Sequence, residues 1–272
     1  DEDQGLFMAD VDHRLCDIEI YTDRSRDRQY GGRNVWMSHI HIDVDNLSFG
    51  YDKDHEVLKN ISFHAHEEDC IAIIGANGAG KSTLLKALVG LIRGSGEIRI
   101  EEIPLSNETL VKIREKVGYV FQDADSQLFM NTVGEDVAFA PRNYGLPEDE
   151  VQKRVDKALE MCRISHLKDR HIFRLSGGEK KLVSIATILS LTPDIILMDE
   201  PSVGLDPKNR RNLINILNSF DHLKIIATHD LDFVLDTCNR VILLSEGKVV
   251  YDGDAQTILN DKEMLEKHDL EL

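Results

Sequence analysis

The stretch Gly75-Ala76-Asn77-Gly78-Ala79-Gly80-Lys81-Ser82 decides the fold, because its residues have the spacing of a phosphate-binding loop. A short apolar stretch, Cys70–Ile74, precedes it, and a segment with helical spacing of leucines, 83–92, follows it. Strand, glycine loop and helix in this order are the context in which such a loop binds an anion. A glycine-rich turn without a ligand is the alternative, and the intact context disfavours it.

The residue types of this loop suit a triphosphate. Glycines allow backbone N–H groups to turn inward around an anion, and the start of a helix adds unpaired N–H donors. Lys81 supplies a positive charge for the β- and γ-phosphates, and the Ser82 hydroxyl suits Mg²⁺. We therefore predict a nucleoside triphosphate site formed by Asn77, Gly78, Gly80, Lys81, Ser82 and Thr83.

Composition narrows the class of protein. The 272 residues are 42% hydrophobic, and 32 basic against 49 acidic side chains give a formal charge of −17. An acidic surface argues against broad nucleic-acid or anionic-membrane binding, so we predict no nucleic-acid partner. No apolar run approaches the roughly 20 residues of a membrane helix. The four cysteines have no metal or redox spacing, which fits a reducing cytosol; they are Cys16, Cys70, Cys162 and Cys238.

The chain divides into a polar N-terminal segment and an alternating α/β part. Residues 1–37 show no catalytic pattern, and a tag, a misassigned start and a flexible extension all stay open as interpretations. From residue 40 on, apolar strands alternate with helices, which predicts a mostly parallel sheet covered on both faces. A mostly helical block, 132–191, interrupts this pattern.

Two histidine pairs, His39/His41 and His64/His66, each have the spacing that places both rings on one face of a strand. A metal pair and solvated strand histidines are the two interpretations. The lack of an evident third ligand nearby favours the second.

A second nucleotide motif follows a buried strand further along the chain. The run Ile195–Asp199 ends in a carboxylate, at the end of a strand where open α/β sheets place their ligands. Asp199 is expected to hold Mg²⁺, and Glu200 to orient or deprotonate an attacking water. Two acids after an apolar strand also occur at an ordinary loop start, but the upstream phosphate loop favours the functional interpretation.

Residues 175–179, Leu-Ser-Gly-Gly-Glu, determine the class. A Ser-Gly-Gly run at a helix start is a second anion site; a plain N-cap explains Ser176 but not the two glycines. Together with the other two motifs, this run makes the chain resemble the nucleotide-binding subunit of ATP-binding-cassette proteins over residues 40–268. That family's signature loop typically ends in Gln, where this chain has Glu179.

The resemblance implies the fold class. It is α/β, with a P-loop NTPase core of mixed, mostly parallel sheet, an N-terminal antiparallel β part and an inserted α-helical subdomain. Residues 38–272 are then one ATPase domain, with the helical subdomain inserted at about 123–190 and a short helical tail at about 255–272.

The resemblance also implies roles for single residues. Tyr51 matches the aromatic residue that stacks on adenine, and Gln122 the glutamine that touches Mg²⁺ and the attacking water. His229 matches the switch histidine at the γ-phosphate, and Asp206 the key acid of a loop at the dimer interface. The implied catalytic set is Glu200, His229 and Gln122, and the implied metal set is Ser82, Gln122 and Asp199, with ATP or ADP and Mg²⁺ as cofactors.

The family works as a head-to-tail dimer, so the resemblance implies a second ATPase subunit, identical or different. ATP on the phosphate loop of one subunit is covered by the signature loop of the other, where Ser176 and Gly178 supply donors in trans. ATP then holds the pair together, and hydrolysis opens it.

Segments 117–129 and 132–141 are similar to cassettes of cobalt and energy-coupling-factor importers of vitamins and metals. In that group the segment after the glutamine forms a groove for a coupling helix of the transmembrane subunit. Gln127, Leu128 and Phe129 are the expected contacts, with ordinary helix packing of Leu128 and Phe129 as the alternative. Glu179 adds negative charge beside the partner's triphosphate, and we expect it to weaken closure of the dimer.

We therefore predict an ATPase subunit, peripheral to the cytoplasmic face of the cell membrane, that energises import of a vitamin or metal ion. Its partners are a transmembrane coupling subunit and a substrate-binding membrane subunit. The alternative is a soluble ATPase of the same family acting in translation or DNA repair. That class generally fuses two cassettes or inserts long coiled coils, and neither pattern occurs in this sequence.

Overall fold

The phosphate loop lies between a buried strand and a helix, as the sequence predicts. The structure is a computed structural model that describes residues 40–52 and 55–270. Strand β3 (Cys70–Ile74) is buried along its whole length, and helix α1 (Lys81–Leu88) begins directly after Gly80. The predicted N-terminal segment 1–37 and His39 lie outside the described residues.

Helix α1 ends earlier than the leucine spacing of 83–92 predicts. Gly90 has a φ of 65°, and the N–H groups of Gly90 and Leu91 donate to the carbonyls of Ala87 and Lys86. This pair of hydrogen bonds with a left-handed glycine terminates a helix. Leu91 therefore lies outside the helix and is exposed, although its spacing fits the helical pattern.

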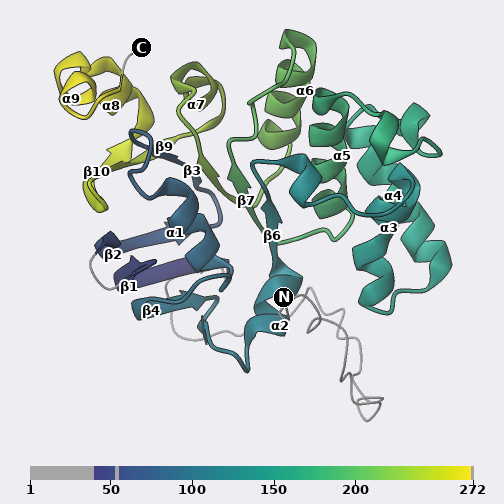
Figure 1. Cartoon of the computed structure of the whole chain (residues 1–272), viewed down its shortest axis with the longest axis horizontal. Coiled ribbons are helices and arrows are strands. Elements are labelled where there is room, and N and C mark those ends of the chain that lie inside the picture. Colours follow the sequence, from purple (N-terminus) through teal and green to yellow (C-terminus); the bar gives the residue numbers. More distant parts are fainter. Residues whose placement is uncertain (1–39, 53–54, 271–272) are drawn as a thin grey trace, which may run out of the picture. The chain divides into compact units, whose positions relative to one another are not determined.

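Strand β3 belongs to a six-stranded sheet in the order β10-β9-β3-β8-β7-β6 (Figure 1). Five strands are parallel, and only β10 runs antiparallel, beside β9. Parallel strands end at a common edge, so the loops after β3, β6, β7 and β8 meet there. The other strands are β6 (Val117–Val120), β7 (Ile195–Asp199), β8 (Leu223–Ala227), β9 (Arg240–Ser245) and β10 (Lys248–Asp254).

A second, antiparallel sheet of four strands in the order β2-β1-β4-β5 forms the N-terminal part. Its members are β1 (His41–Gly50), β2 (Glu56–His66), β4 (Ser95–Ile100) and β5 (Ile103–Pro104), the last too short for periodicity to predict. Leu84 and Leu88 of α1 share one buried cluster with Ile42 of this sheet and Ile73 of the other. Helix α2 (Leu110–Lys116) adds Ile113 to the same cluster.

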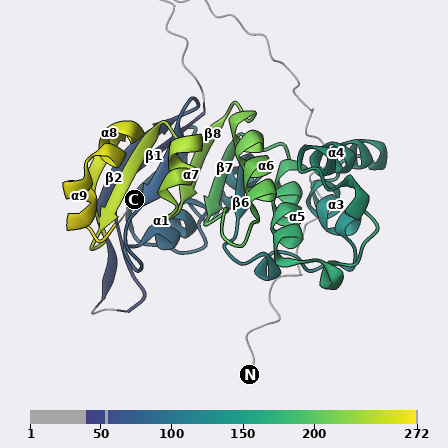
Figure 2. The ribbon, with the colours of Figure 1, turned by 90° about the horizontal axis from the view of Figure 1, so that it is seen from above.

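The opposite face of the parallel sheet is also covered. Along β3, Ile71 and Ile73 enter the cluster with α1, whereas Ala72 and Ile74 pack against the C-terminal helices (Figure 2). Alternate side chains of a strand point to opposite faces, so both faces are buried as predicted. The covering helices are α7 (Leu231–Thr237), α8 (Ala255–Asn260) and α9 (Lys262–Lys267).

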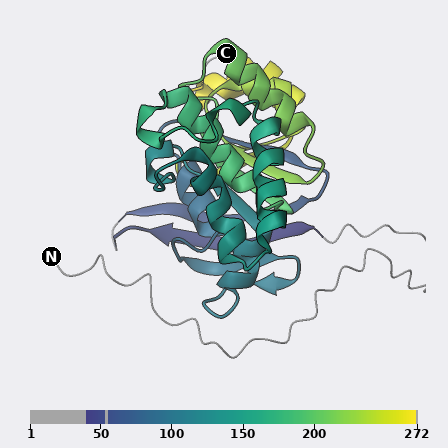
Figure 3. The same cartoon turned by 90° about the vertical axis from the view of Figure 1, so that its right-hand side faces the viewer.

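The helical block, which faces the viewer in Figure 3, packs around a third buried cluster. It contains α3 (Val133–Asn143), α4 (Glu148–Met161) and α5 (Gly177–Leu189), all within the predicted helical block, 132–191. Short 3₁₀ turns connect them: η1 (Ala124–Ser126), η2 (Ser165–Leu167) and η3 (Ile172–Arg174). Helix α6 (Pro207–Asn218) joins the cluster through Leu213. The predicted fold class is thereby confirmed.

Candidate functional site

A pocket of about 350 Å³ opens at the phosphate loop. It collects residues from four separate parts of the chain, and every lining residue except Val57 belongs to the set predicted from the sequence. The lining residues are Tyr51, Val57, Asn77, Gly78, Gly80, Lys81, Ser82, Thr83, Gln122 and Glu200.

The backbone of the loop requires glycine. Gly78 and Gly80 have φ values of 83° and 107°, a region that side chains with a Cβ rarely adopt. A Cβ on Gly75 would lie 2.3 Å from the carbonyl oxygen of Leu244. Among the described residues, no backbone carbonyl accepts a hydrogen bond from the N–H groups of Gly78, Gly80 or Lys81. These donors at a helix start are available to an anion.

Lys81 is held in place within the loop. Its ammonium group donates to the carbonyl oxygens of Gly75, at 2.7 Å, and Ala76, at 3.2 Å. Burial lowers the pKa of Lys81, while the nearby carboxylates of Glu200 and Asp199 oppose that shift. The charge therefore lies at the loop with its side chain already ordered.

Ser82 and Asp199 meet at the same edge. The Ser82 hydroxyl donates to Asp199 Oδ1 at 2.9 Å, and the Tyr119 hydroxyl lies 3.5 Å from Asp199 Oδ2. Burial raises the pKa of Asp199, an effect that the Ser82 hydrogen bond partly offsets. A hydroxyl, a carboxylate and the amide of Gln122 are all oxygen donors, the ligand type that Mg²⁺ takes. These residues fit the ion.

Glu200, which lines the pocket, forms a hydrogen-bonded pair with His229. His229 Nδ1 lies 2.8 Å from Glu200 Oε1, and the Thr228 hydroxyl donates to Glu200 Oε2 at 3.0 Å. Glu200 has a φ of 46°, and its N–H donates to the carbonyl oxygen of Ala227. A left-handed backbone at a non-glycine residue is strained and is frequent at functional sites.

Lys181 belongs to none of the sequence motifs, yet it contacts the site. It lies one turn into α5 and is only 3% exposed. Its ammonium donates to the backbone carbonyls of Phe121, at 3.0 Å, and Gln122, at 2.8 Å. Burial lowers its pKa to about 8, with Asp199 and other carboxylates acting in the opposite direction. Lys181 thus ties the helix of the signature loop to the Gln122 segment. A lysine in this helix reads as a surface residue, so no sequence signal identified it.

Tyr51 lines the pocket and is 63% exposed. Its edge packs against Phe49, with ring centroids 4.9 Å apart, and its hydroxyl lies 3.4 Å from Thr83 Oγ1. An aromatic face held at the mouth of a phosphate pocket can receive a flat base.

The signature loop does not line this pocket. Ser176 caps α5 and Glu179 completes a capping box: its carboxylate accepts from the Ser176 N–H at 2.8 Å and the Ser176 hydroxyl at 2.9 Å. These contacts lower the pKa of Glu179. Asp206 caps α6, and its carboxylate accepts from the N–H groups of Lys208 and Asn209, both at 2.9 Å. A Cβ on Gly178 would lie 3.7 Å from the Gly204 carbonyl, so the two predicted trans loops are neighbours.

The three expected groove residues have different environments. The amide of Gln127 bonds to Ser184 and Thr187 inside the protein, and Leu128 is buried, so these two are structural. Phe129 alone is 64% exposed, edge-on to Phe139 at 4.6 Å between ring centroids.

The turn that carries Phe129 is fixed by a buried carboxylate. Asp136 accepts from the N–H groups of Phe129 and Met130, at 3.0 and 2.9 Å. Burial raises the pKa of Asp136, against the effect of these two hydrogen bonds.

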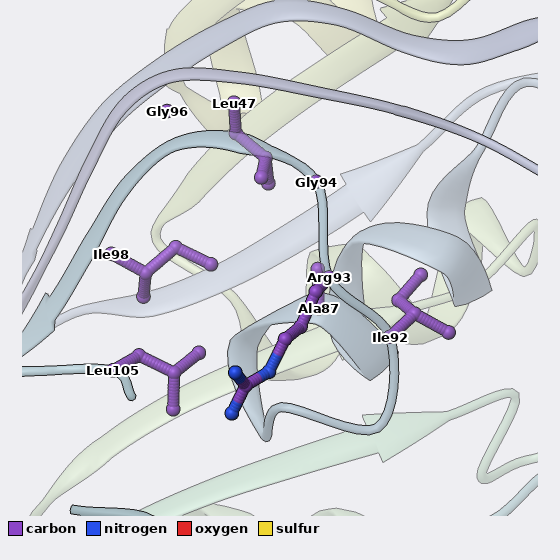
Figure 4. Close-up of a pocket in the computed structure, with 8 residues that line it drawn as sticks. All are labelled: Leu47, Ala87, Ile92, Arg93, Gly94, Gly96, Ile98 and Leu105. Carbon is purple, nitrogen blue, oxygen red and sulfur yellow. The ribbon is translucent and has the colours of Figure 1, made fainter. Parts of the chain in front are cut away.

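A histidine cluster on the antiparallel sheet and a second pocket contain none of the residues predicted to bind the nucleotide. His41, His64 and Asp43 lie on one face of the antiparallel sheet, with His64 hydrogen-bonded to Asp43. Within residues 40–52 and 55–270, no group of three or more His, Cys, Asp or Glu side chains is arranged to hold a metal. A second pocket, of about 210 Å³, is lined by aliphatic residues, two glycines and one charged residue, Arg93 (Figure 4).

No helix in the described part of the chain is both long enough and apolar enough to pass through a lipid bilayer. Residues 58–203 match the family model described as ABC transporter. A putative ABC transporter ATP-binding protein of Geobacter sulfurreducens is 48% identical over 230 residues, which cover 84% of this chain and 92% of that protein. An energy-coupling factor transporter ATP-binding protein, EcfA of Methanothermobacter thermautotrophicus, is 41% identical and covers 85% of this chain and 76% of its own length.

Solved structures agree with these relatives. The cbiO1 protein of Clostridium perfringens, described as part of the ABC transporter complex cbiONQ, has a TM-score of 0.74 at 39% identity, covering 85% of this chain and 95% of that one. A dimeric ATP-binding cassette in a post-hydrolysis state, bound to ADP and phosphate, has a TM-score of 0.72 at 27% identity, covering 79% and 98%. With its phosphate pocket, its acidic strand end and its signature loop, the chain belongs to the ABC transporter family and is an ATP-binding, ATP-hydrolysing subunit.

Proposed function

We propose that this chain is the ATPase subunit of an energy-coupling-factor type importer of a vitamin or metal ion. It works as a head-to-tail dimer on the cytoplasmic face of the membrane, with a transmembrane coupling subunit and a substrate-binding membrane subunit. Relatives named energy-coupling factor ATP-binding proteins, 41% and 40% identical, support this class. The alternative, a soluble ATPase in translation or DNA repair, is disfavoured by these relatives and by the acidic composition.

The dimer is supported by one observation: the predicted nucleotide-binding residues are divided between two separate places on the chain. The residues expected to act on the chain's own nucleotide line one pocket or bond to its walls, whereas Ser176, Gly178 and Asp206 do not line it. Bound phosphates need donors on their outer side as well. A second subunit brings its Ser176 and Gly178 to that side. Because the Ser176 hydroxyl already donates to Glu179, this hydrogen bond has to rearrange when the loop meets the partner's nucleotide.

Hydrolysis uses groups that the pocket already positions. The loop N–H groups and Lys81 bind the phosphates, and Tyr51 stacks on the base. Glu200 accepts the proton of the attacking water, while His229, donating from Nδ1, keeps the carboxylate oriented. Ser82, Gln122 and Asp199 hold Mg²⁺, which offsets phosphate charge when bound.

Phe129 is the contact we assign to the transmembrane coupling subunit. It is a large exposed apolar side chain on a turn that Asp136 fixes, and exposed aromatic residues at fixed positions are common anchors of interfaces. The roles predicted for Gln127 and Leu128 are not retained, because both are engaged inside the protein.

The test replaces Phe129 and follows the membrane partner. In cells that express the chain with its transmembrane subunit, Phe129→Asp should abolish co-purification of that subunit from detergent-solubilised membranes, while ATP turnover of the isolated chain is kept. Leu235→Asp, at a 48% exposed apolar position on α7, is the matched control and should change neither. If the transmembrane subunit co-purified equally well with the Phe129 variant, Phe129 would not be the contact. Co-purification of the chain with ribosomes or DNA would favour the alternative function.

A further inference from the structure

Two cysteines that are 168 residues apart in the sequence lie side by side in the structure. The sulfur atoms of Cys70 and Cys238 are 3.5 Å apart. Cys70 begins β3, and Cys238 directly follows α7. Neither residue has a role in the nucleotide site, and the other described cysteine, Cys162, is buried elsewhere in the helical block.

The main chain holds these two sulfurs together. The N–H of Asn239 donates to the carbonyl of Cys70 at 3.1 Å, and the N–H of Cys70 donates to the Asn239 side chain at 3.0 Å. The N–H of Cys238 donates to the carbonyl of Val234, at 2.8 Å. A disulfide bond is about 2.05 Å long, so bond formation requires the two sulfur atoms to approach by about 1.5 Å.

The two thiols differ in exposure and in bonding. Cys70 is only 5% exposed and donates its S–H to Cys238, which is partly exposed. This hydrogen bond raises the pKa of Cys70 and lowers the pKa of Cys238. The thiolate is the reactive form of cysteine, so Cys238 is the more reactive thiol of the pair.

We propose that Cys70 and Cys238 are a redox modification site that forms a reversible disulfide in the folded protein. The oxidant is a hydroperoxide. Cysteine pairs that oxidise inside a reducing compartment act transiently, as sensors rather than as permanent cross-links. A transient disulfide is therefore compatible with the reducing cytosol that the widely spaced cysteines of the sequence indicate.

The chemistry balances with one peroxide. The Cys238 thiolate attacks one oxygen of the peroxide, the O–O bond breaks, and a sulfenic acid and one water form after the thiol proton is transferred. The Cys70 sulfur then attacks Cys238 Sγ, the S–O bond breaks, and hydroxide leaves and takes the Cys70 proton as the second water. Two thiols have lost two electrons and two protons, and one hydrogen peroxide has become two waters.

The disulfide ties the end of α7 to the start of β3. At their other ends, β3 leads into the phosphate loop and α7 begins two residues after His229. Cys238 also packs against two of the three buried clusters. The cross-link therefore restrains a junction of the core, and it restricts the unfolded chain over a long loop, which stabilises the folded state.

The experiment uses the full chain with Cys16→Ser and Cys162→Ser, so that only the pair remains. After hydrogen peroxide treatment, the protein is unfolded with an alkylating reagent and its mass and peptides are measured. We expect both thiols to disappear together, a linked peptide pair within one chain, recovery of both thiols with dithiothreitol, and a melting temperature several degrees higher in the oxidised form.

Single variants separate the proposal from general oxidation. With Cys238→Ser in the same background, Cys70 should remain alkylatable, and with Cys70→Ser the oxidised Cys238 should form no link within the chain. The same peptide mapping on the unmodified protein covers the case in which a variant does not fold. Oxidation of Cys238 while Cys70 stays free, or links only between chains, would overturn the proposal.

Discussion

At the scale of single residues, Glu200 combines burial, backbone strain and hydrogen bonding. Its side chain is held from two sides by Thr228 and His229, and its φ of 46° carries a cost of about 1 kcal/mol or more. A strained residue persists only where the surroundings fix it. The carboxylate is thus aimed before the substrate arrives, which is what a general base needs.

Glu200→Gln tests this role, because glutamine keeps the size and shape of the side chain and one acceptor oxygen but is not a base. We expect ATP turnover to fall by about 100-fold or more, with ATP affinity retained, as measured by phosphate release and by equilibrium binding. Glu246→Gln is the control: Glu246 has a φ of 48° in an exposed turn outside the pocket lining. Normal turnover in the Glu200 variant would exclude it as the base.

At the scale of elements, α5 links the signature loop, which is predicted to act on the partner's nucleotide, to the Gln122 segment, which is predicted to act on the chain's own nucleotide. The capping box of Ser176 and Glu179 begins the helix, and Lys181, one turn further along, reaches the Gln122 carbonyl. The signature loop and the Gln122 segment therefore belong to one hydrogen-bonded unit. The charge of Glu179, which the sequence presents as a liability for closure, serves within the subunit to hold the Ser176 loop.

The buried Lys181 predicts a pH dependence of stability. Its pKa is about 8 in the folded protein against 10.5 ordinarily. Below pH 8 both states hold the proton, and the cost of burying the charge is fully present. Between pH 8 and 10.5 the unfolded chain binds more protons than the folded one, so the free energy of unfolding rises with pH in this window.

The magnitude of this effect is on the order of 2 kcal/mol, at about 1.4 kcal/mol for each pKa unit. Urea unfolding of the wild type and Lys181→Gln at pH 7.5 and pH 10 measures it, because the variant lacks the titrating group. We expect the wild type to gain stability relative to the variant at the higher pH. Lys157→Gln, at an exposed position of α4, should track the wild type. A constant difference between wild type and Lys181→Gln would contradict the buried charge.

Elements with strong local patterns are predictable from the sequence. The helices α3, α4 and α5 and the strand β7 follow apolar spacing that needs no knowledge of the fold. The early end of α1 differs from the predicted helix, because the apolar spacing continues to Leu91 although Gly90 terminates the helix. The apolar spacing favours a longer helix, whereas the hydrogen bonds of Gly90 and Leu91 end the helix, and the hydrogen bonds determine where it ends.

At the scale of the whole molecule, the proposed active unit is a pair of chains with two composite sites. A two-fold dimer places each signature loop opposite the partner's phosphate loop. Lys81 then acts on the chain's own nucleotide, while Ser176 acts on the partner's. Each composite site thus needs Lys81 from one chain and Ser176 from the other. Loss of Lys81 disables the site on the chain's own phosphate loop, whereas loss of Ser176 disables the site on the partner's phosphate loop.

Mixing two inactive variants tests this arrangement. Lys81→Ala and Ser176→Arg should each lack ATPase activity when alone. Mixed in equal amounts, half of the dimers carry one intact site, so turnover should recover to on the order of a quarter of the wild type. Mixing Lys81→Ala with Lys81→Ala, Ser176→Arg supplies no intact site and serves as the control. Absence of recovery, with both variants folded and able to exchange subunits, would refute the composite site.

The sequence by itself determined the nucleotide chemistry of this protein. The phosphate loop, the acidic strand end and the signature loop are each a contiguous run of sequence. Their backbone geometry follows from glycines, hydroxyls and carboxylates within the same run. The tertiary structure alone decided that Lys181 holds the Gln122 segment, that Phe129 is exposed while Leu128 is buried, and that Cys70 meets Cys238. Hydrogen bonds and thiol contacts act over a few ångströms, and only the packed sheet and helices bring residues so distant in sequence within that range.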